Sequence, residues 1–419
     1  MPSKKQIVIL GGGFGGLRAA LNIEKKLRRL KLLERYAVVL VDKNDAHEYT
    51  PLLYEIATYT EEASCGRKLR ELVLYHFREL LRGRAITFTE DEVLYIDVSA
   101  GRVHLRKSEL PFDYLVLALG AEENYFDIPG AKEYSFSIKT FGKALRARSA
   151  VFQAYKDHGR NARVLVGGGG ATGVEIAAEI KNWLPAISVT LLDSEEQILS
   201  GFSPRAVQKV CVRLRRLGVR IFSGYRILEV SPHEITGTNG RKISFDVFLW
   251  TAGVRAPSLS HPMPFSRARG ERISISGELL CVPEGPDLKI FRKMYAIGDV
   301  GCFTLRESDE PAPMLAAVAI EQALLVSKNI IEEIKKKEGI ARERYARSYK
   351  PKKKYPYVIP LGGKFAVAEI GPFIFSGYSA WVLKGLVELR YLLTLMPFWK
   401  ALRTWWRGFW FFVRNDRLG

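Results

Sequence analysis

Cysteine is scarce in this sequence, and a long apolar run is absent. Cys65, Cys211, Cys281 and Cys302 are the four cysteines among 419 residues, and they are far apart in the chain. Their spacing argues against a disulfide framework, a redox dithiol and a structural zinc site, so we expect unpaired thiols in a reducing compartment and no metal ion. No uncharged stretch reaches the roughly 18 residues that a membrane-spanning helix needs.

A recognisable targeting signal is also lacking, and acidic residues are outnumbered. Residues 1–10 lead into glycines rather than a cleavage site, so we expect a cytoplasmic location. The chain carries 64 Lys and Arg against 45 Asp and Glu, a formal net charge of +19. Such a charge suits a polyanionic partner, either nucleic acid or an anionic membrane surface. The length allows two or three domains with a sizeable core.

A glycine-rich segment follows the first predicted strand. QIVIL, residues 6–10, is a β-branched apolar run typical of a buried strand. It leads into Gly11-Gly12-Gly13-Phe14-Gly15-Gly16 and then a helical pattern. GxGxxG between a strand and a helix predicts a dinucleotide site, because the glycines let backbone amides approach a pyrophosphate at the helix N-terminus. The next strand, AVVLVD, ends in Asp42, which is placed to accept hydrogen bonds from a ribose.

The same pattern recurs in the middle of the chain. RVLV, residues 163–166, leads into Gly168-Gly169-Gly170-Ala171-Thr172-Gly173, a helical segment and the strand SVTLLD, which ends in Asp193. This acid follows the last glycine at about the 20-residue separation expected of a ribose ligand. No arginine follows Asp193 directly, which favours NADH over NADPH. Two fingerprints predict two nucleotides and electron transfer between them.

A third segment indicates which nucleotide each site holds. KMYAIGDV, residues 293–300, ends in Gly298-Asp299 and resembles the second flavin-binding signature of flavoproteins with two dinucleotide-binding domains. There the Asp bonds the ribityl chain, and the helix that follows points its positive end at the flavin ring. YLVLALGA (114–121) and VFLWTAGV (247–254) resemble the crossover strands of such proteins.

Taken together, these segments resemble the single-subunit type II NADH dehydrogenases, which are membrane-associated NADH:quinone oxidoreductases. The likeness covers nearly the whole chain. Its most specific parts are PLLYE (51–55) and ENYFDIPG (123–130), together with GGGATGVE (168–175), TAGV, AIGDV and GYSAWVLKGLVELRYLL (377–393). The resemblance implies an α/β fold of two Rossmann-like domains, for FAD and NADH, and a C-terminal amphipathic helical region that binds membranes.

The resemblance also implies residue roles. FAD is expected at Gly11, Gly13, Gly16, Asp42 and Asp299, and NADH at Gly168, Gly170, Gly173 and Asp193. Further cofactor contacts are implied for Phe14, Gly15, Lys43, Pro51, Leu52, Val93, Gly120, Ala319, Thr172 and Gly253. Glu175 is expected near the nicotinamide, in NADH handling or proton transfer. The alternative is a first-turn acid that complements the helix dipole.

One segment departs from the family. Where the family has A-Q-x-A-x-Q-Q beside the quinone, this chain has Ala316-Ala317-Val318-Ala319-Ile320-Glu321-Gln322, so that Gln322 is the one glutamine of the three that is kept. A quinone carbonyl needs a hydrogen-bond donor, which neither Ala317 nor an ionised Glu321 supplies. One hypothesis is that Glu321 has a raised pKa and gives a proton to the quinone. The other is an exposed helix Glu, with the quinone held by packing.

The end of the chain combines tryptophan with arginine. On a helical projection Lys400, Arg403, Arg407 and Arg414 lie within about 60° of one another. The predicted opposite side holds Trp399, Leu402, Trp405, Trp406, Phe409, Trp410, Phe412 and Val413, and Phe411 falls among the cations. This pattern predicts a helix in the membrane interface, where aromatic rings and cations meet anionic headgroups. The alternative is a helix packed on its own core.

These inferences give a domain plan. We expect an FAD domain at 1–115 and 253–335, an NADH domain at 116–252, a basic linker at 336–364 and a membrane-binding region at 365–419. The predicted enzyme is a non-pumping NADH:quinone oxidoreductase, peripheral to the cytoplasmic face of the membrane. The sequence leaves the oligomeric state open, a homodimer included. The alternatives are a sulfide:quinone oxidoreductase, another NAD(P)H-dependent flavoprotein, or a binding protein like apoptosis-inducing factor, although we expect no nucleic acid.

Overall fold

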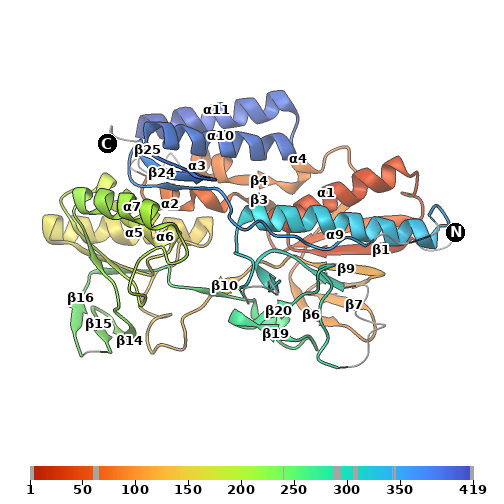
Figure 1. Cartoon of the computed structure of the whole chain (residues 1–419), viewed down its shortest axis with the longest axis horizontal. Coiled ribbons are helices and arrows are strands. Elements are labelled where there is room, and N and C mark those ends of the chain that lie inside the picture. Colours follow the sequence, from red (N-terminus) through yellow and green to blue (C-terminus); the bar gives the residue numbers. More distant parts are fainter. Residues whose placement is uncertain are drawn as a thin grey trace. The chain divides into compact units, whose positions relative to one another are not determined.

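The computed structural model describes residues 4–59, 66–238, 240–285, 294–304, 310–341, 343 and 346–415, without the side chains of 66–68, 412, 414 and 415. Cys65, Lys293 and the side chains of Phe412 and Arg414 therefore lie outside the described part. The chain forms two compact units of three segments each. Unit 1 holds residues 1–47, 75–122 and 254–352, and unit 2 holds 48–74, 123–253 and 353–419 (Figure 1).

Unit 1 is built on a five-stranded parallel sheet of order β21-β9-β1-β2-β5. Because both faces of a parallel sheet are covered, its strands are nearly continuous apolar runs. When the strands of this sheet are numbered by their order in the chain and read from β5 to β9, they follow the order 3-2-1-4, which is the Rossmann arrangement. The strands are β1 (Lys5–Leu10), β2 (Tyr36–Asp42), β5 (Ile86–Glu90), β9 (Tyr114–Leu117) and β21 (Met294–Ala296).

Two long helices of unit 1 pack side by side. They are α1 (Phe14–Arg29) and α9 (Ala316–Lys337), and the Ser327 hydroxyl lies 3.4 Å from the Ala19 carbonyl oxygen. Basic residues in the last turn of each helix complement its dipole. The smaller elements of this unit are α4 (Phe77–Leu80), the meander β6 (Val93–Asp97), β7 (Arg102–Leu105) and β8 (Glu109–Pro111), β18 (Val254–Arg255), η4 (Ser258–Ser260), β19 (Arg267–Ala268), η5 (Arg269–Glu271), β20 (Arg272–Ser274), η6 (Gly298–Val300) and β22 (Gly301–Cys302).

Unit 2 repeats the plan with a four-stranded parallel sheet of order β13-β12-β11-β17. In chain order this is again 3-2-1-4, which confirms the prediction of two Rossmann-like domains. The sheet comprises β11 (Arg163–Gly167), β12 (Ser188–Leu192), β13 (Val219–Phe222) and β17 (Val247–Trp250). The associated elements are α5 (Phe141–His158), η3 (Gly159–Asn161), α6 (Ala171–Trp183), α7 (Pro204–Leu217), β14 (Ile227–Ser231), β15 (Glu234–Gly237) and β16 (Lys242–Ser244).

Helix α7 shows how local sequence sets these bounds. Ser203 is its N-cap and accepts from the Ala206 amide at 3.4 Å, and Pro204 occupies the first helical position. Gly218 ends the helix in the left-handed conformation, with φ of 82°.

Unit 2 also contains the C-terminal region. The antiparallel sheet β23 (Tyr357–Pro360), β24 (Ala366–Ile370) and β25 (Phe373–Gly377) is followed by α10 (Tyr378–Leu395) and α11 (Phe398–Asn415). The early segments η1 (Thr50–Leu52), α2 (Leu53–Ile56) and α3 (Gly66–Val73) belong to the same unit. Among the described residues, no helix is both long enough and apolar enough to span a membrane.

The units differ from the predicted domain plan in three ways. The changes of unit fall at 122, within β10 (Glu122–Glu123), and at 253, rather than at 115 and 252. Residues 48–74 join unit 2, where Tyr49 stacks on Tyr391 of α10 and Glu55 is paired with Lys384 of the same helix. The predicted linker stays with unit 1 as far as Lys352, which is paired with Glu321 at 2.6 Å.

Candidate functional site

The first glycine fingerprint follows β1 and lies against the residue after β9, because a Cβ on Gly11 would lie 2.3 Å from the Ala118 carbonyl oxygen. Gly11 has φ of 99°, and its amide donates to the Val41 carbonyl at 2.8 Å. A Cβ on Gly16 would lie 1.8 Å from the Gly11 carbonyl oxygen. Any side chain there would push helix α1 off the strand, so the close approach requires glycine.

Asp42 closes this loop from the end of β2. Its carboxylate accepts from the Gly12 amide at 2.6 Å and from the Asn44 amide at 2.9 Å. Burial raises the pKa of Asp42, and the hydrogen bonds from Gly12 and Asn44 act in the opposite direction. The predicted ribose ligand therefore has a second task, which is to hold the glycine loop.

The second fingerprint repeats these contacts one by one. Gly168 has φ of 106°, and its amide donates to the Leu192 carbonyl at 2.8 Å. A Cβ on Gly173 would again lie 1.8 Å from the first glycine's carbonyl oxygen. Asp193 accepts from the Gly169 amide at 2.7 Å, as Asp42 does from Gly12. The duplication seen in the sequence is therefore a duplication of hydrogen bonds.

The third segment meets the first fingerprint inside unit 1. A Cβ on Gly15 would lie 3.2 Å from the Ile297 side chain and 3.5 Å from the Ala319 carbonyl oxygen. The buried Gln322 side chain accepts from the Gly298 amide at 2.7 Å, which fixes which end of the side-chain amide faces that donor. The first turns of α9 thus lie against Gly298 and η6, as expected of the helix that follows Asp299.

Each fingerprint leaves room for a ligand at the same point. A Cβ added to Gly13 or to Gly170 would meet nothing within 4 Å. Both residues are helix N-caps without a side-chain capping bond, and neither helix has an acid in its first turn. Unsatisfied amides at an open, positive helix end fit a pyrophosphate. The residues present therefore fit one dinucleotide in each unit.

The remaining predicted contacts are spread over both units. In unit 1, Phe14 begins α1, Lys43 is exposed after β2, Val93 begins β6 and Gly120 has φ of 69°. In unit 2, Pro51 is exposed, Leu52 is buried and Thr172 is exposed near the start of α6. A Cβ on Gly253 would lie 2.6 Å from the Phe126 ring. Direct contact of these residues with a cofactor stays a prediction.

Glu175 is partly exposed and interacts with two ionisable side chains of unit 2, the buried Glu55 and the half-buried Lys384. It lies beyond the first turn of α6, which excludes the first-turn alternative. Loss of hydration raises the pKa of Glu175 to about 8; Lys384 acts in the opposite direction and Glu55 adds to the rise. A carboxyl group with this pKa can carry a proton at neutral pH.

Lys384 is the central cation of this group. Its ammonium group contacts the Glu55 carboxylate and the Tyr54 hydroxyl, and that hydroxyl donates to Glu55 at 2.8 Å. Burial acts to lower the pKa of Lys384, but the attraction of Glu55 outweighs it and the pKa is raised. Loss of hydration also raises the pKa of Glu388, one turn along α10, to about 8.

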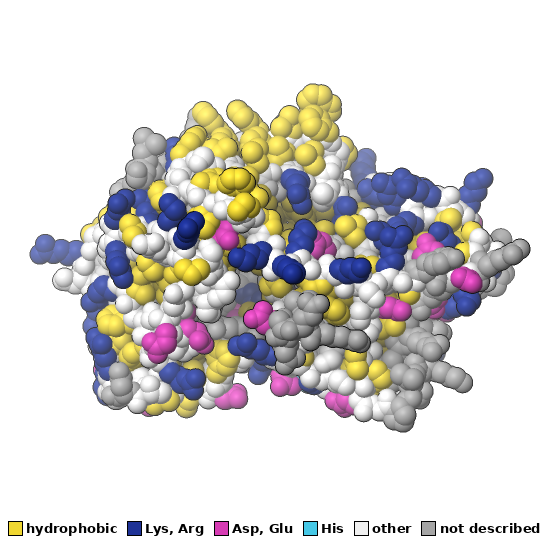
Figure 2. Space-filling model, viewed as in Figure 1, with side chains coloured by type: hydrophobic (Ala, Val, Ile, Leu, Met, Phe, Trp, Pro, Cys, Tyr) yellow, Lys and Arg dark blue, Asp and Glu magenta, His cyan; other side chains and the backbone are white. Residues whose placement is uncertain are grey.

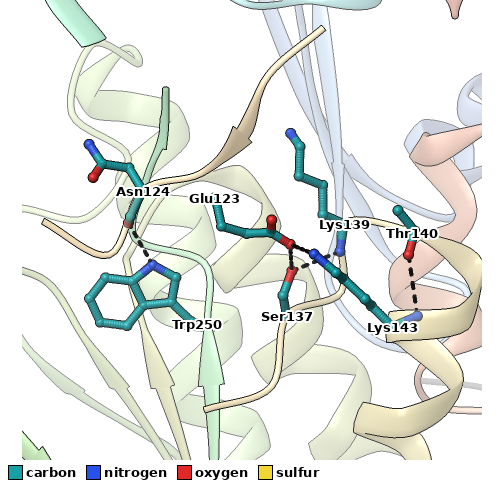
Figure 3. A network of polar contacts seen from close by, with 7 residues as sticks. All are labelled: Glu123, Asn124, Ser137, Lys139, Thr140, Lys143 and Trp250. Carbon is teal, nitrogen blue, oxygen red and sulfur yellow. Dashed lines mark hydrogen bonds and ion pairs between the residues drawn. The ribbon is translucent and has the colours of Figure 1, made fainter. Parts of the chain in front are cut away.

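The segment ENYFDIPG is anchored in unit 2 by a polar network (Figure 3). Glu123 accepts from the Ser137 hydroxyl at 2.6 Å and is paired with Lys143. The Trp250 indole donates to the Asn124 carbonyl at 2.9 Å. These bonds hold the start of the segment beside the end of β17.

A family model described as pyridine nucleotide-disulphide oxidoreductase matches residues 5–323. The chain belongs to the pyridine nucleotide-disulphide oxidoreductase family. Among the described cysteines of this family member, Cys281 and Cys302 are buried and Cys211 is partly buried. Burial raises the pKa of the Cys281 thiol, which makes it a poor nucleophile.

Individual relatives agree with the resemblance predicted from the sequence. A type II NADH:quinone oxidoreductase, Ndh, of Mycobacterium tuberculosis is 28% identical over 96% of this chain and 88% of its own length. One from Staphylococcus aureus is 27% identical over 78% of this chain and 82% of its own length. NDH2 of Plasmodium falciparum, solved in complex with NADH, has a TM-score of 0.80 at 17% identity and covers 98% of both chains. The sulfide:quinone oxidoreductase of Aquifex aeolicus has a TM-score of 0.74 at 18% identity, over 96% of this chain and 92% of its own.

Sequence reasoning missed two residues that the structure places at the first site. Arg272 is buried, and its guanidinium donates to the Asp299 carbonyl at 2.9 Å and to the Gly301 carbonyl. His47 is buried beside Gly12. Arg272 gives no signal in the sequence, because it binds main-chain atoms. A histidine five residues after the strand-end acid is a signal that could have been used.

Proposed function

We propose that this flavoprotein is a non-pumping NADH:quinone oxidoreductase that binds FAD in unit 1 and NADH in unit 2. The observation that carries the proposal is that the glycine fingerprint occurs once in each unit. In each, an aspartate accepts a hydrogen bond from the glycine loop, and the N-terminus of the following helix is open. Two dinucleotides in one chain suit transfer of reducing equivalents from one to the other. The names of the curated relatives support the same reaction.

Bound FAD would supply the redox chemistry, as a hydride acceptor for the nicotinamide and a two-electron donor to a quinone. The protein's part is binding and orientation. The amides at the start of α1 would hold the pyrophosphate, Asp42 would bind the ribose, and Asp299 would bind the ribityl chain. Arg272 and Gln322 support the last of these by holding the backbone on either side of Asp299.

Preference for NADH follows from acidic side chains at the end of β12. Asp193 is followed in the chain by the exposed Glu195 and Glu196. The Asp193 carboxylate also accepts from the Glu195 amide at 2.9 Å. A 2′-phosphate on the adenosine ribose would be repelled by these carboxylates, which disfavours NADPH.

Glu175 is the proposed proton-holding group on the NADH side. Reduction of a quinone takes up two protons, and a carboxyl group with a pKa of about 8 can supply one at neutral pH. On α9, Glu321 is partly exposed and its carboxylate is paired with Lys352. The proton-donor role of Glu321 stays a hypothesis, and an ammonium partner is one feature that opposes it. Gln322 is buried, so its proposed role on the quinone side is indirect. Its side chain holds the Gly298 amide in place.

Helix α11 is the proposed membrane-contacting element. Its aromatic residues divide between two faces: Trp405 donates to the Gly385 carbonyl at 2.6 Å, and Phe409 packs on Trp381, whereas Trp399, Trp406 and Trp410 are exposed. Figure 2 shows hydrophobic side chains gathered over α10 and α11 at the top of the view. The predicted separation of aromatics from cations is wrong in part, because the spacing of the exposed tryptophans places them beside Arg403. Phe411, which broke the predicted pattern, stacks on Tyr59 with ring centroids 4.7 Å apart.

This exposed face suits the interfacial zone of an anionic membrane. Trp399 is 77% exposed, and the neighbouring Lys400, Arg403 and Arg407 are also exposed. Tryptophan rings favour the headgroup level, and each cation near anionic lipid contributes about 1 kcal/mol. We infer peripheral binding at the cytoplasmic face, which gives a soluble flavoenzyme access to a substrate dissolved in lipid. A homodimer remains part of the proposal.

Steady-state assays test this function directly. Purified protein reconstituted with FAD should oxidise NADH only when a short-chain quinone is present, and NADPH should be a much poorer donor. The fold match to a sulfide:quinone oxidoreductase supplies the rival reaction. Quinone reduction driven by sulfide but not by NADH would replace the proposal with that rival.

A further inference from the structure

His47 is buried next to the first glycine fingerprint, and its Nδ1 lies 2.9 Å from the Gly12 carbonyl oxygen. Two aromatic rings flank the imidazole. Phe14, the first residue of α1, meets it edge to face at a centroid distance of 5.1 Å, and Tyr75 is stacked at 6.4 Å. The ring is therefore held in one orientation by packing.

Gly12 is fixed at each of its backbone groups. Its amide donates to Asp42, and its carbonyl accepts from His47. A Cβ would lie 2.1 Å from the Phe77 ring, so no side chain fits.

The second fingerprint fixes its middle glycine with the same pattern by different means. The Gly169 amide donates to Asp193 at 2.7 Å, and the Gly169 carbonyl accepts from the Leu199 amide at 2.8 Å. Leu199 is a buried leucine with φ of 55°, a conformation that costs a non-glycine residue about 1 kcal/mol or more. In both fingerprints the carbonyl of the middle glycine therefore has a hydrogen-bond donor. The donor is the His47 side chain at Gly12 and the strained Leu199 main chain at Gly169.

We propose that His47 is a positioning residue of the FAD site, which acts by holding the Gly12–Gly13 peptide so that the Gly13 amide points at the pyrophosphate. The C=O of Gly12 and the N–H of Gly13 belong to one planar trans peptide and point in opposite directions. A donor on the carbonyl therefore sets the direction of the amide. Gly13 is the helix N-cap, with open space before it.

The hydrogen on the imidazole is assigned by its partner. A carbonyl oxygen only accepts, so Nδ1 must carry the hydrogen. Burial lowers the pKa of His47 to about 4, and the bond to Gly12 acts in the opposite direction. Both the neutral Nδ1–H form and the cation donate from Nδ1, so the bond to Gly12 is kept across the working pH range.

Amide side chains give a matched test of this idea, which rests on the proposed FAD assignment. In His47→Asn the side-chain NH₂ falls close to the place of Nδ1, whereas in His47→Gln it falls one bond farther out. His47→Met fills the space without a donor. His76→Asn is the control, because His76 is an exposed histidine of the same unit that is paired with Asp45.

Apoprotein of each variant is titrated with FAD and followed by flavin fluorescence, and NADH binding to the same apoprotein reports on unit 2. We expect His47→Gln and His47→Met to bind FAD roughly tenfold more weakly, the equivalent of one buried hydrogen bond of about 1.4 kcal/mol. His47→Asn should stay within about threefold of the wild type because it keeps the donor. His76→Asn and all NADH affinities should be unchanged.

Equal FAD affinity of the wild type, His47→Gln and His47→Met would overturn the positioning role while leaving the proposed function intact. Equal weakening by Asn, Gln and Met would also overturn it, because the effect would then follow the imidazole shape rather than the donor. Wild-type apoprotein that binds no FAD would instead contradict the proposed function itself.

Discussion

The ammonium group of Lys384 in α10 is paired with the buried carboxylate of Glu55 in α2, 329 residues away in the chain. Both residues belong to unit 2, so the pair fastens the C-terminal region to the segment that follows β3 (Ala46–Glu48). Glu175, Glu179 and Glu388 are further carboxyl groups that interact electrostatically with this lysine. The half-buried Lys384 therefore acts against the rise in pKa that loss of hydration causes at Glu175 and Glu388.

Loss of this cation should be costly. Lys384→Met leaves Glu55 buried without a counter-charge, and breaking a buried pair in this way costs about 3–5 kcal/mol. Thermal unfolding of the whole chain measures the effect. The double variant Lys384→Met with Glu55→Gln should recover part of the loss. The control is Lys242→Met, which breaks the exposed pair with Glu234 and should cost less than about 1 kcal/mol. Equal effects of the two lysine variants would refute the assignment.

The raised pKa of Glu388 makes stability depend on pH. Between its usual value of 4.5 and about 8, the unfolded chain ionises Glu388 while the folded chain keeps the proton. The folded state then binds more protons, so stability falls as pH rises through this window. Glu388→Gln removes that loss and should stabilise the protein at pH 8 relative to pH 5, by at most a few kcal/mol at about 1.4 kcal/mol per pKa unit. Denaturant unfolding of both proteins at pH 5 and pH 8 measures this change in the free energy of unfolding. If Glu388→Gln gives no relative gain in stability at pH 8, or a relative loss, the raised pKa of Glu388 is contradicted.

The two open glycines should separate the two cofactors. Gly13→Ala puts a methyl group where the FAD pyrophosphate is proposed to lie, and Gly170→Ala does the same for NADH. Each variant should fold, because the added Cβ meets no protein atom within 4 Å. We expect the first to lose FAD and keep NADH binding, and the second to do the reverse, as measured by titration of the apoprotein. Loss of both ligands in either variant would be evidence against separate sites.

The exposed tryptophans should control membrane binding. Trp399, Trp406 and Trp410 changed together to Ser should reduce sedimentation with anionic liposomes without affecting NADH oxidation by a soluble quinone. Changing Lys400, Arg403 and Arg407 to Gln should weaken binding by about 1 kcal/mol each at low salt. Leu228→Ser, which removes an exposed leucine of β14, is the control. Undiminished liposome binding by the tryptophan variant would exclude this face as the contact.

Glu321 offers a test of the quinone side. Glu321→Gln removes a partly exposed pair with Lys352, so stability should change by less than about 1 kcal/mol. Flavin reduction by NADH should be unaffected. If Glu321 donates a proton to the quinone, the pH dependence of quinone reduction should lose one titrating group. An unchanged pH profile would rule out the proton-donor role.

The sequence predicted those parts of the fold that depend on local chemistry. Gly11, Gly16 and Asp42 follow strand and helix patterns that any Rossmann fold imposes, and the same holds for Gly168, Gly173 and Asp193. What it could not predict depends on contacts distant in the chain. His47 reaches Gly12 across 35 residues, and Lys384 reaches Glu55 across 329. Nor could a helical projection of α11 show that Trp405 and Phe409 pack inward, because their partners lie in α10.

Anaerobic mixing tests the central claim most directly. FAD-loaded protein is mixed with NADH while the flavin absorbance near its visible maximum is recorded, and a water-soluble quinone is then added. The account predicts bleaching by NADH, followed by full recovery when the quinone arrives. Flavin that stays oxidised in excess NADH, or that bleaches and is not reoxidised by quinone, would contradict it.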